Sequence, residues 1–270
     1  MRRKLEGRSA VVTGGLTGQG LAIAQALAAA GANVSIGSRE AARWQGSAEP
    51  EHIADIRRRL SAHGGAVHIG PLDVRDTSVI EHFARSAEAV CGPADILVNS
   101  AGMTMEQPVC GHSEELWLKV IDTNLNGAFR MTRTYLPGMI ERKWGRIINI
   151  GSTAASVGWK DNPAYCASKS GLLGLTRCVA LEGAPHGVTC VMISPTWVET
   201  ELMLNNVREL VEREGKGRTV EEAYADIARD NPQQRVIQVD EVAALAAFLC
   251  GDEARGITME NIQITGGALW

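Results

Sequence analysis

The sequence lacks any long apolar run. No stretch approaches the ~20 consecutive apolar residues that a helix needs to span a bilayer. The chain starts MRRKLEGRSAVV, in which Glu6 and Gly7 interrupt the apolar segment that a secretory signal requires. We therefore expect a cytoplasmic protein with no membrane partner.

Paired cysteines are also missing. The six cysteines form no C-x-x-C pair and show no histidine at the spacing of a zinc site. A chain of 270 residues buries enough apolar surface to fold without disulfides or metals. The cysteines are therefore interpreted as free thiols, and no metal site is predicted.

Neither sign of charge is in large excess. The 27 Lys and Arg residues stand against 31 Asp and Glu residues, for a formal net charge of -4. The longest basic clusters, Arg2-Arg3-Lys4 and Arg57-Arg58-Arg59, are typical of a solvated tail and a solvated helix face. Such a chain has no field strong enough to gather a phosphate backbone, so we expect no nucleic-acid partner.

What the sequence does contain is an alternation of short apolar runs and helical segments. The predicted strands are residues 10–12, 34–36, 67–69, 96–98, 147–150, 189–193 and 262–264, and the predicted helices are residues 20–30, 50–62, 77–90, 114–142, 163–183 and 240–250. This alternation is typical of βαβ units. We predict an α/β fold over residues 1–270: a single-domain, Rossmann-type, doubly wound parallel sheet of about seven strands with helices on both faces.

Residues 199–238 depart from this alternation. They are rich in charge and contain Gly215, Gly217 and Pro232. We expect one or two amphipathic helices that stand off the sheet and serve as a substrate lid. A surface insertion without function is the alternative.

A glycine-rich turn follows the first predicted strand and opens the first helix. It reads Thr13-Gly14-Gly15-Leu16-Thr17-Gly18-Gln19-Gly20. Glycines let a backbone turn tightly beside a diphosphate, and a helix N-terminus offers free N–H groups and a positive dipole end. This position predicts a dinucleotide site, although a structural βα turn can show the same pattern.

The end of the second strand predicts which dinucleotide binds. An acid there would bind a free adenosine ribose and repel a 2′-phosphate. The strand ends Gly37-Ser38-Arg39, without an acid at the first loop position, and Arg39 offers a fork of donors to a phosphate. NADP(H) is therefore favoured. NAD(H) remains the alternative, because Glu40 could pair with Arg39.

Tyr165 and Lys169 lie four residues apart on a predicted helix, so both project from one face. Forming a phenolate at pH 7 costs about 4 kcal/mol. An ammonium ~4–5 Å away returns about 3–4 kcal/mol at an effective dielectric near 20. These magnitudes nearly cancel, which brings the tyrosine within reach of general acid–base catalysis.

Further residues occur in the order and spacing of a known family. They are Asp73-Val74, Asn99-Ser100-Ala101-Gly102, Asn124 within Asn-Leu-Asn-Gly, and Ser152 thirteen residues before Tyr165. With the glycine turn, this pattern resembles the short-chain dehydrogenase/reductase family from about Leu5 to Gly267. The resemblance implies an NAD(P)-dependent oxidoreductase that transfers a hydride between the nicotinamide and a secondary alcohol or ketone.

The resemblance also implies roles for individual residues. Tyr165 would exchange the proton with the substrate oxygen, and Ser152 would hold that oxygen. Lys169 would lower the tyrosine pKa and bind the nicotinamide ribose, and Asn124 would support a water relay. The implied cofactor-binding residues are Gly14, Leu16, Thr17, Gly18, Gln19, Gly20, Ser38, Arg39, Asp73, Val74, Asn99, Ala101, Gly102, Tyr165, Lys169, Pro195, Val198 and Thr200.

Some positions depart from the family pattern. Ser100 replaces the second asparagine of Asn-Asn-Ala-Gly, Thr196 follows Pro195 where glycine is usual, and Gln19 stands where isoleucine is common. The stretch from Glu40 to Pro50 also looks longer than typical. None of these changes removes a catalytic group, so they bear on affinity and specificity only.

The substrate is predicted less precisely than the cofactor and the catalytic residues. The loops that form the pocket in this family supply a mostly apolar set here: Met103, Met105, Val109, Ala154, Trp159, Trp197, Leu202, Met203 and Leu204. This set favours a hydrophobic or medium-chain carbonyl substrate, and the family resemblance adds a 3-oxoacyl-type ketone. The alternatives are an NAD-dependent alcohol, 3-hydroxy acid, sugar or cyclitol dehydrogenase, and more remotely a catalytically silent dinucleotide sensor.

A homo-oligomer, dimer or tetramer, is also implied by the resemblance. The apolar contacts are expected from Trp117, Phe129, Leu136, Leu172, Leu173 and Leu175, and from the C-terminal segment 266–270.

Overall fold

The structure, a computed structural model, describes residues 4–44, 49–215 and 217–268. Its centre is one parallel sheet in the order β3-β2-β1-β4-β5-β6-β7. The strands are β1 (Ser9–Thr13), β2 (Asn33–Ser38), β3 (Val67–Pro71), β4 (Ile96–Asn99), β5 (Gly145–Ile150), β6 (Val188–Pro195) and β7 (Asn261–Ile264). Each predicted strand is present, and the doubly wound fold is confirmed.

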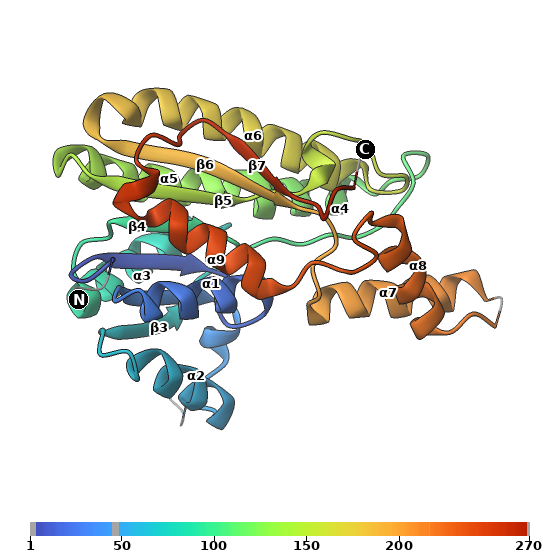
Figure 1. Cartoon of the computed structure of the whole chain (residues 1–270), viewed down its shortest axis with the longest axis horizontal. Coiled ribbons are helices and arrows are strands. Elements are labelled where there is room, and N and C mark those ends of the chain that lie inside the picture. The colour runs from blue at the N-terminus through green and yellow to red at the C-terminus, as the bar shows by residue number, and fades with distance from the viewer. Residues whose placement is uncertain (1–3, 45–48, 216, 269–270) are drawn as a thin grey trace.

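Helices cover both faces of this sheet (Figure 1). They are α1 (Gly18–Ala29), α2 (Glu51–Ser61), α3 (Thr77–Cys91), α4 (Glu114–Ile121), α5 (Gly127–Glu141), α6 (Pro163–Gly183), α7 (Glu201–Glu214), α8 (Val220–Asp230) and α9 (Val239–Cys250). The apolar faces of α1, α2 and α9 pack on one side of the sheet, and those of α3, α5 and α6 pack on the other. Every residue of β1, β5 and β6 is buried between these layers, as expected for parallel strands covered on both faces.

The helix predicted over 114–142 is wrong in its middle. One turn of π-helix, Asp122–Asn126, separates α4 from α5. The side chain of Asn124 in this turn hydrogen-bonds the main chain of Met103 in both directions, at 2.9 Å each. These tertiary bonds fit the widened turn, and such turns frequently occur at functional sites.

Helices α7 and α8 stand off the end of the sheet (Figure 1), so segment 199–238, for which one or two amphipathic helices were predicted, contains two. Their apolar sides face each other and form a small core of their own around Met203, Val207 and Ala223. The two ends of the segment meet in a single parallel bridge between Val198 and Ile237. The segment therefore leaves the rest of the fold and rejoins it at neighbouring points.

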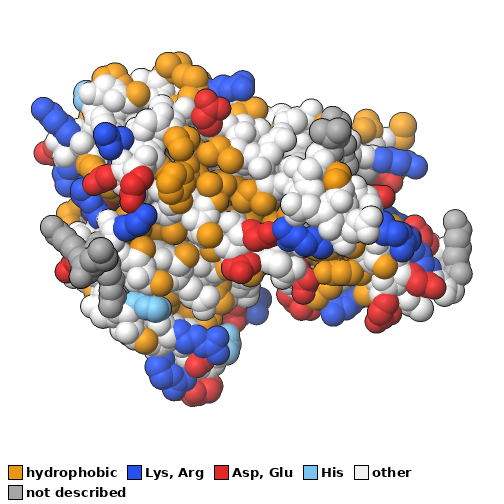
Figure 2. Space-filling view, viewed as in Figure 1, with side chains coloured by type: hydrophobic (Ala, Val, Ile, Leu, Met, Phe, Trp, Pro, Cys, Tyr) orange, Lys and Arg blue, Asp and Glu red, His pale blue; other side chains and the backbone are white. Residues whose placement is uncertain are grey.

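The outer surface mixes both signs of charge, and Figure 2 shows this for one face.

Trp117 and Phe129 are exposed as expected, whereas Leu136 and Leu172 are 8% and 1% exposed and belong to the core. The expectation that these two leucines form an intersubunit surface is therefore wrong. Arg2, Arg3, positions 45–48 of the long loop, Leu269 and Trp270 lie outside the described residues.

Within the described residues, no helix has the length and apolar character to cross a membrane. The same residues contain no group of three or more His, Cys, Asp or Glu side chains arranged to hold a metal ion. All six cysteines are free thiols, and Cys110 and Cys178 are exposed.

Candidate active site

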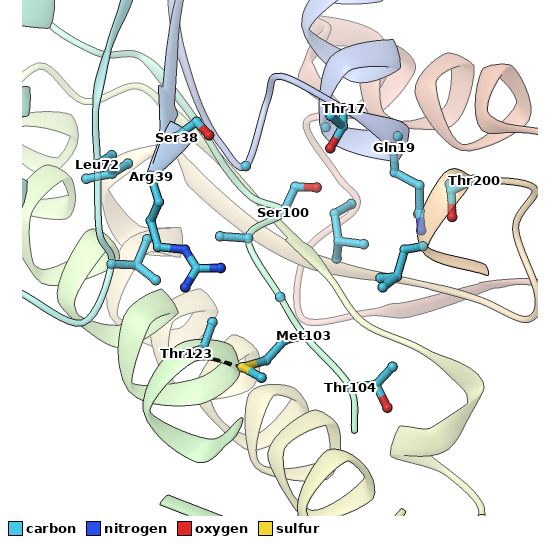
Figure 3. Close-up of a pocket in the computed structure, with 18 of the residues that line it drawn as sticks. Thr17, Gln19, Ser38, Arg39, Leu72, Ser100, Met103, Thr104, Thr123 and Thr200 are labelled. Atoms are coloured by element: carbon cyan, nitrogen blue, oxygen red, sulfur yellow. Dashed lines mark hydrogen bonds between the residues drawn. The ribbon is translucent and has the colours of Figure 1, made fainter. Parts of the chain in front are cut away.

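A cavity of about 640 Å³ opens at the carboxyl ends of the central strands (Figure 3). Strand β1 lies between β2 and β4, and the order in which successive strands are added to the sheet reverses at this point. Ligands of open α/β sheets bind at this switch point. The cavity is lined by the glycine turn, the ends of β2 and β5, the loop after β4, helix α6 and the start of α7.

The glycine turn fits a diphosphate. Gly14 and Gly18 have φ of 64° and 52°, a backbone region that favours glycine. A Cβ on Gly20 would lie 2.4 Å from the carbonyl oxygen of Gly14, so no larger residue fits there. Helix α1 has no acidic residue in its first turn, and the Thr17 side chain caps none of its N–H groups. These N–H groups and the helix dipole are therefore available to an anion.

The adenosine end of this cavity is basic. Arg39 extends from the end of β2 into the cavity (Figure 3), next to Ser38. Glu40 pairs with His52 at 2.9 Å, whereas Arg39 has no ion pair with any described residue. The pairing of Glu40 with Arg39 that sequence analysis considered is therefore not seen, and the Arg39 guanidinium is available to a ligand.

Two arginines missed by sequence analysis, Arg43 and Arg75, also line this end. Arg75 holds both carboxylate oxygens of Asp73, at 2.9 Å and 2.6 Å, and this lowers the pKa of Asp73. Arg43 follows Arg39 by four residues in a short 3-10 helix, and Arg75 follows Asp73 by two, but neither spacing belongs to a recognised motif.

Tyr165 and Lys169 project from α6 toward the end of β5, where Ser152 lies. The Lys169 ammonium donates to the carbonyl oxygen of Ile150 at 2.7 Å and lies 5.6 Å from the centroid of the Tyr165 ring. Burial lowers the pKa of Lys169 to about 8. Burial also raises the pKa of Tyr165, and a hydrogen bond with Ser152 opposes that rise. The three predicted catalytic groups therefore lie together.

Asn124 completes this cluster from the π turn. Besides its two bonds to Met103, its amide donates to the Ser168 hydroxyl at 3.1 Å. A Cβ on Gly102 would lie 3.5 Å from Asn124 Oδ1 and 3.8 Å from Lys169 Nζ. A side chain on this glycine would therefore be in van der Waals contact with both Asn124 and Lys169.

Most of the predicted cofactor residues line the cavity. These are Gly14, Thr17, Gly18, Gln19, Gly20, Ser38, Arg39, Asp73, Val74, Ala101, Gly102, Tyr165, Lys169 and Thr200. Leu16, Asn99, Pro195 and Val198 do not line it and are buried. The Asn99 side chain instead donates to Asn149 at 2.8 Å, between the neighbouring central strands β4 and β5.

The predicted apolar substrate pocket is only partly present. Met103 and Leu202 line the cavity, Ala154 and Met203 are buried, and Met105 and Val109 are 48% and 75% exposed. Beside the cavity, the rings of Trp159 and Trp197 stack with centroids 5.1 Å apart. This stack joins the loop after Ser152 to the residues that precede α7.

Three further contacts tie the substrate loops together. Arg213 of α7 pairs with Glu106 at 2.5 Å. The Gln107 N–H donates to the Asp161 carbonyl oxygen at 2.7 Å, and the Thr104 hydroxyl donates to Asn162 Oδ1 at 2.9 Å. The loops after β4 and β5 and helix α7 therefore form one connected wall.

Known proteins match this chain over nearly its whole length. The family model described as Enoyl-(Acyl carrier protein) reductase matches residues 14–268. The D-beta-hydroxybutyrate dehydrogenase of Cupriavidus necator is 37% identical over 98% of this chain and 96% of its own length. The 3-oxoacyl-acyl-carrier-protein reductase of Escherichia coli is 34% identical over 97% of each chain.

A solved structure is similarly close. The crystal structure of an actinorhodin polyketide ketoreductase variant with NADPH has a TM-score of 0.88 and 34% identity, and the match covers 99% of both chains. These matches agree with the glycine turn, the Tyr165–Lys169 pair and the sheet order. The chain is an oxidoreductase that uses a nicotinamide dinucleotide on secondary alcohols or ketones, and it belongs to the short-chain dehydrogenase/reductase family.

Proposed function

We propose that this protein is an NADP(H)-dependent reductase of hydrophobic, 3-oxoacyl-type ketones. The observation that carries the cofactor preference is the Arg39 guanidinium at the end of β2, which forms no ion pair with a described residue and lies in a cavity that Arg43 and Arg75 also line. The first loop position after β2 holds no acid to bind an unphosphorylated ribose. Relatives named as ketoreductases, one solved with NADPH, support the same proposal.

Arg39 and Asp73 would hold the adenosine of the cofactor, the glycine turn would hold its diphosphate, and Tyr165 and Thr200 would face its nicotinamide. All of these residues line one cavity. The dinucleotide would supply or accept the hydride. The chain's own residues hold the cofactor in this orientation and bring the substrate oxygen to the tyrosine.

In this proposal Tyr165 transfers the proton to the substrate oxygen, and Ser152 holds that oxygen by a hydrogen bond. Lys169 stabilises the phenolate and binds the nicotinamide ribose. Its fixed contact with the Ile150 carbonyl oxygen keeps it beside the ring. Asn124 holds the Met103 main chain and supports a water relay to the lysine.

Segment 199–238 is proposed to be the substrate lid. Its base is held by the Val198–Ile237 bridge and by Glu199, which accepts from Tyr224 at 2.5 Å and from Gln238 at 3.1 Å. Thr200, Glu201 and Leu202 at its start line the cavity. A small movement about this base would open the substrate side of the cavity.

We also propose a cytoplasmic homo-oligomer. The exposed thiols of Cys110 and Cys178 fit a reducing compartment. Apolar side chains gather over α9 and β7 in Figure 2, and Phe248 of α9 is 43% exposed. Trp117 and Phe129 add a second apolar surface on α4 and α5. Such surfaces mark association sites, and sedimentation as a monomer at micromolar concentration would contradict the assembly.

The cofactor preference is tested by binding titrations of NADPH and NADH. We expect the wild type to bind NADPH at least about tenfold tighter, a difference of about 1.4 kcal/mol. Arg39→Ala should lose most of this preference, whereas Arg59→Ala on the exposed side of α2 should keep it. Equal or tighter binding of NADH by the wild type would refute the proposal.

That outcome would favour a second candidate, an NAD-dependent 3-hydroxy acid dehydrogenase. Two relatives named D-beta-hydroxybutyrate dehydrogenase, at 37% and 35% identity, support it. Oxidation rates with 3-hydroxybutyrate and NAD, compared with reduction rates of a 3-oxoacyl thioester and NADPH, would separate the two candidates.

A further inference from the structure

Glu40 is an acidic side chain in the wall of the cavity, at the adenosine end. It follows Arg39 directly and begins a 3-10 helix over Glu40–Trp44. Its Oε1 atom lies 2.9 Å from Nε2 of His52, in the first turn of α2. An ionised carboxylate has no proton to donate, so the imidazole donates and the carboxylate accepts. His52 is not among the described residues that line the cavity, so Glu40 is held from outside it.

Arg43 is the cation that Glu40 would otherwise neutralise. Side chains three residues apart in a 3-10 helix eclipse one another. Glu40 and Arg43 are three residues apart in such a helix, and both line the cavity. Arg43 nevertheless forms no ion pair with a described residue, whereas Glu40 is bound to His52. The contact with His52 therefore leaves the Arg43 guanidinium for a ligand.

The charge balance at this end of the cavity depends on where the Glu40 carboxylate is held. Asp73 already offsets the charge of Arg75, through contacts of 2.9 Å and 2.6 Å. Of the guanidiniums that line the cavity, those of Arg39 and Arg43 form no ion pair with a described residue. Two guanidiniums match a 2′-phosphate, which carries about 1.5 to 2 negative charges at neutral pH. A carboxylate released among them would cancel one cation and repel the phosphate, but it would not repel the hydroxyl of an unphosphorylated ribose.

We propose that His52 is a positioning residue that sets the cofactor preference through Glu40. By holding the Glu40 carboxylate, His52 keeps Arg43 for the 2′-phosphate, beside Arg39. The proposal rests on the NADP(H) site given under Proposed function, and it adds Arg43 as a second phosphate-binding residue. Loss of the imidazole donor should therefore weaken NADPH and spare NADH.

The test measures dissociation constants of NADPH and NADH by fluorescence titration. His52→Leu removes the donor, His52→Gln keeps an N–H donor, and His82→Leu on the exposed side of α3 is the matched control. We expect His52→Leu to weaken NADPH by about threefold, the size of one exposed ion pair, and to leave NADH unchanged. His52→Gln and His82→Leu should bind both cofactors like the wild type. Arg43→Met should weaken NADPH by about fivefold and leave NADH unchanged.

Glu40→Gln separates positioning from a merely structural role of the ion pair. It breaks the same contact from the other side, but it also removes the carboxylate, so NADPH should bind at least as tightly as to the wild type. A structural role would instead weaken NADPH binding in both His52→Leu and Glu40→Gln. In the double variant, His52→Leu should have no further effect, because no carboxylate is left to hold.

Each outcome decides the proposal. Equal weakening of NADPH and NADH by His52→Leu would overturn it, as would an unchanged ratio of the two dissociation constants. An effect of His52→Leu that persists in Glu40→Gln would overturn it as well. A wild type that prefers NADH refutes the cofactor preference alone, because the role of His52 is read from the change in the ratio between variant and wild type. Melting temperatures without ligand serve as the folding control, and Glu40→Gln keeps the proposal testable if His52→Leu unfolds.

Discussion

The buried lysine of the active site should make the protein's stability depend on pH in a particular window. Lys169 is 6% exposed, and burial lowers its pKa from 10.5 to about 8. Between these values the unfolded chain binds more protons at this site than the folded chain, so folding becomes more favourable as the pH rises. At about 1.4 kcal/mol per pH unit, the gap of 10.5 − 8 corresponds to about 3 kcal/mol.

The perturbation that isolates this effect is Lys169→Met. The variant also loses the hydrogen bond to Ile150, but the slope of the difference between wild type and variant depends only on the folded and unfolded pKa of Lys169. Free energies of unfolding are measured by urea titration of cofactor-free protein, at fixed concentration, from pH 7 to pH 10. We expect the wild type to gain about 2–3 kcal/mol relative to the variant as the pH rises through this range.

Lys119→Met, which removes an exposed lysine of α4, controls for the loss of one charge. A difference between wild type and Lys169→Met that stays flat from pH 7 to pH 10 would refute the reasoning. It would mean that the ammonium is hydrated in the folded protein and that burial contributes little to its energetics.

Two further substitutions test the site at other points. Tyr165→Phe should lower kcat by about 10²–10⁴-fold and leave the NADPH dissociation constant within twofold, because only the proton donor is lost. Stopped-flow kinetics measure kcat, and fluorescence titration measures the dissociation constant. A kcat near that of the wild type would mean that another residue is the acid. Gly20→Ala places a Cβ 2.4 Å from the Gly14 carbonyl oxygen, so the turn must shift. We expect a stability loss of about 1–3 kcal/mol together with weaker NADPH binding. A melting temperature and an NADPH dissociation constant equal to those of the wild type would contradict this.

The strands and the catalytic pair were predictable because their signals are local. Strands covered on both faces are continuous apolar runs, and β6 is buried over its whole length. Tyr165 and Lys169 share a helix, where a spacing of four fixes a common face. The glycine turn is equally local, because Gly14 and Gly18 adopt the positive φ that their residue type permits.

Two of the three failures depend on contacts between distant segments, and the third is a contact within one loop. The π turn fits the bonds between Asn124 and Met103, which lie 21 residues apart, while its own sequence is compatible with a regular helix. Leu136 and Leu172 carry no sign of which helix face meets the sheet, and both prove to be buried. Arg75 binds the Asp73 carboxylate within the loop after β3, and no helical or strand periodicity in the sequence indicates this contact.

Lys169 is a buried cation in the wall of the cofactor cavity, and Arg39 lies exposed at the other end without an ion pair to a described residue. Burial of the ammonium costs free energy in the folded chain, and a ligand that hydrogen-bonds to it offsets part of this cost. A ligand that binds only the folded state adds about 2.7 kcal/mol at one hundred times its dissociation constant. Cofactor binding should therefore raise the free energy of unfolding, and part of this gain should come from new hydrogen bonds to the buried Lys169 ammonium.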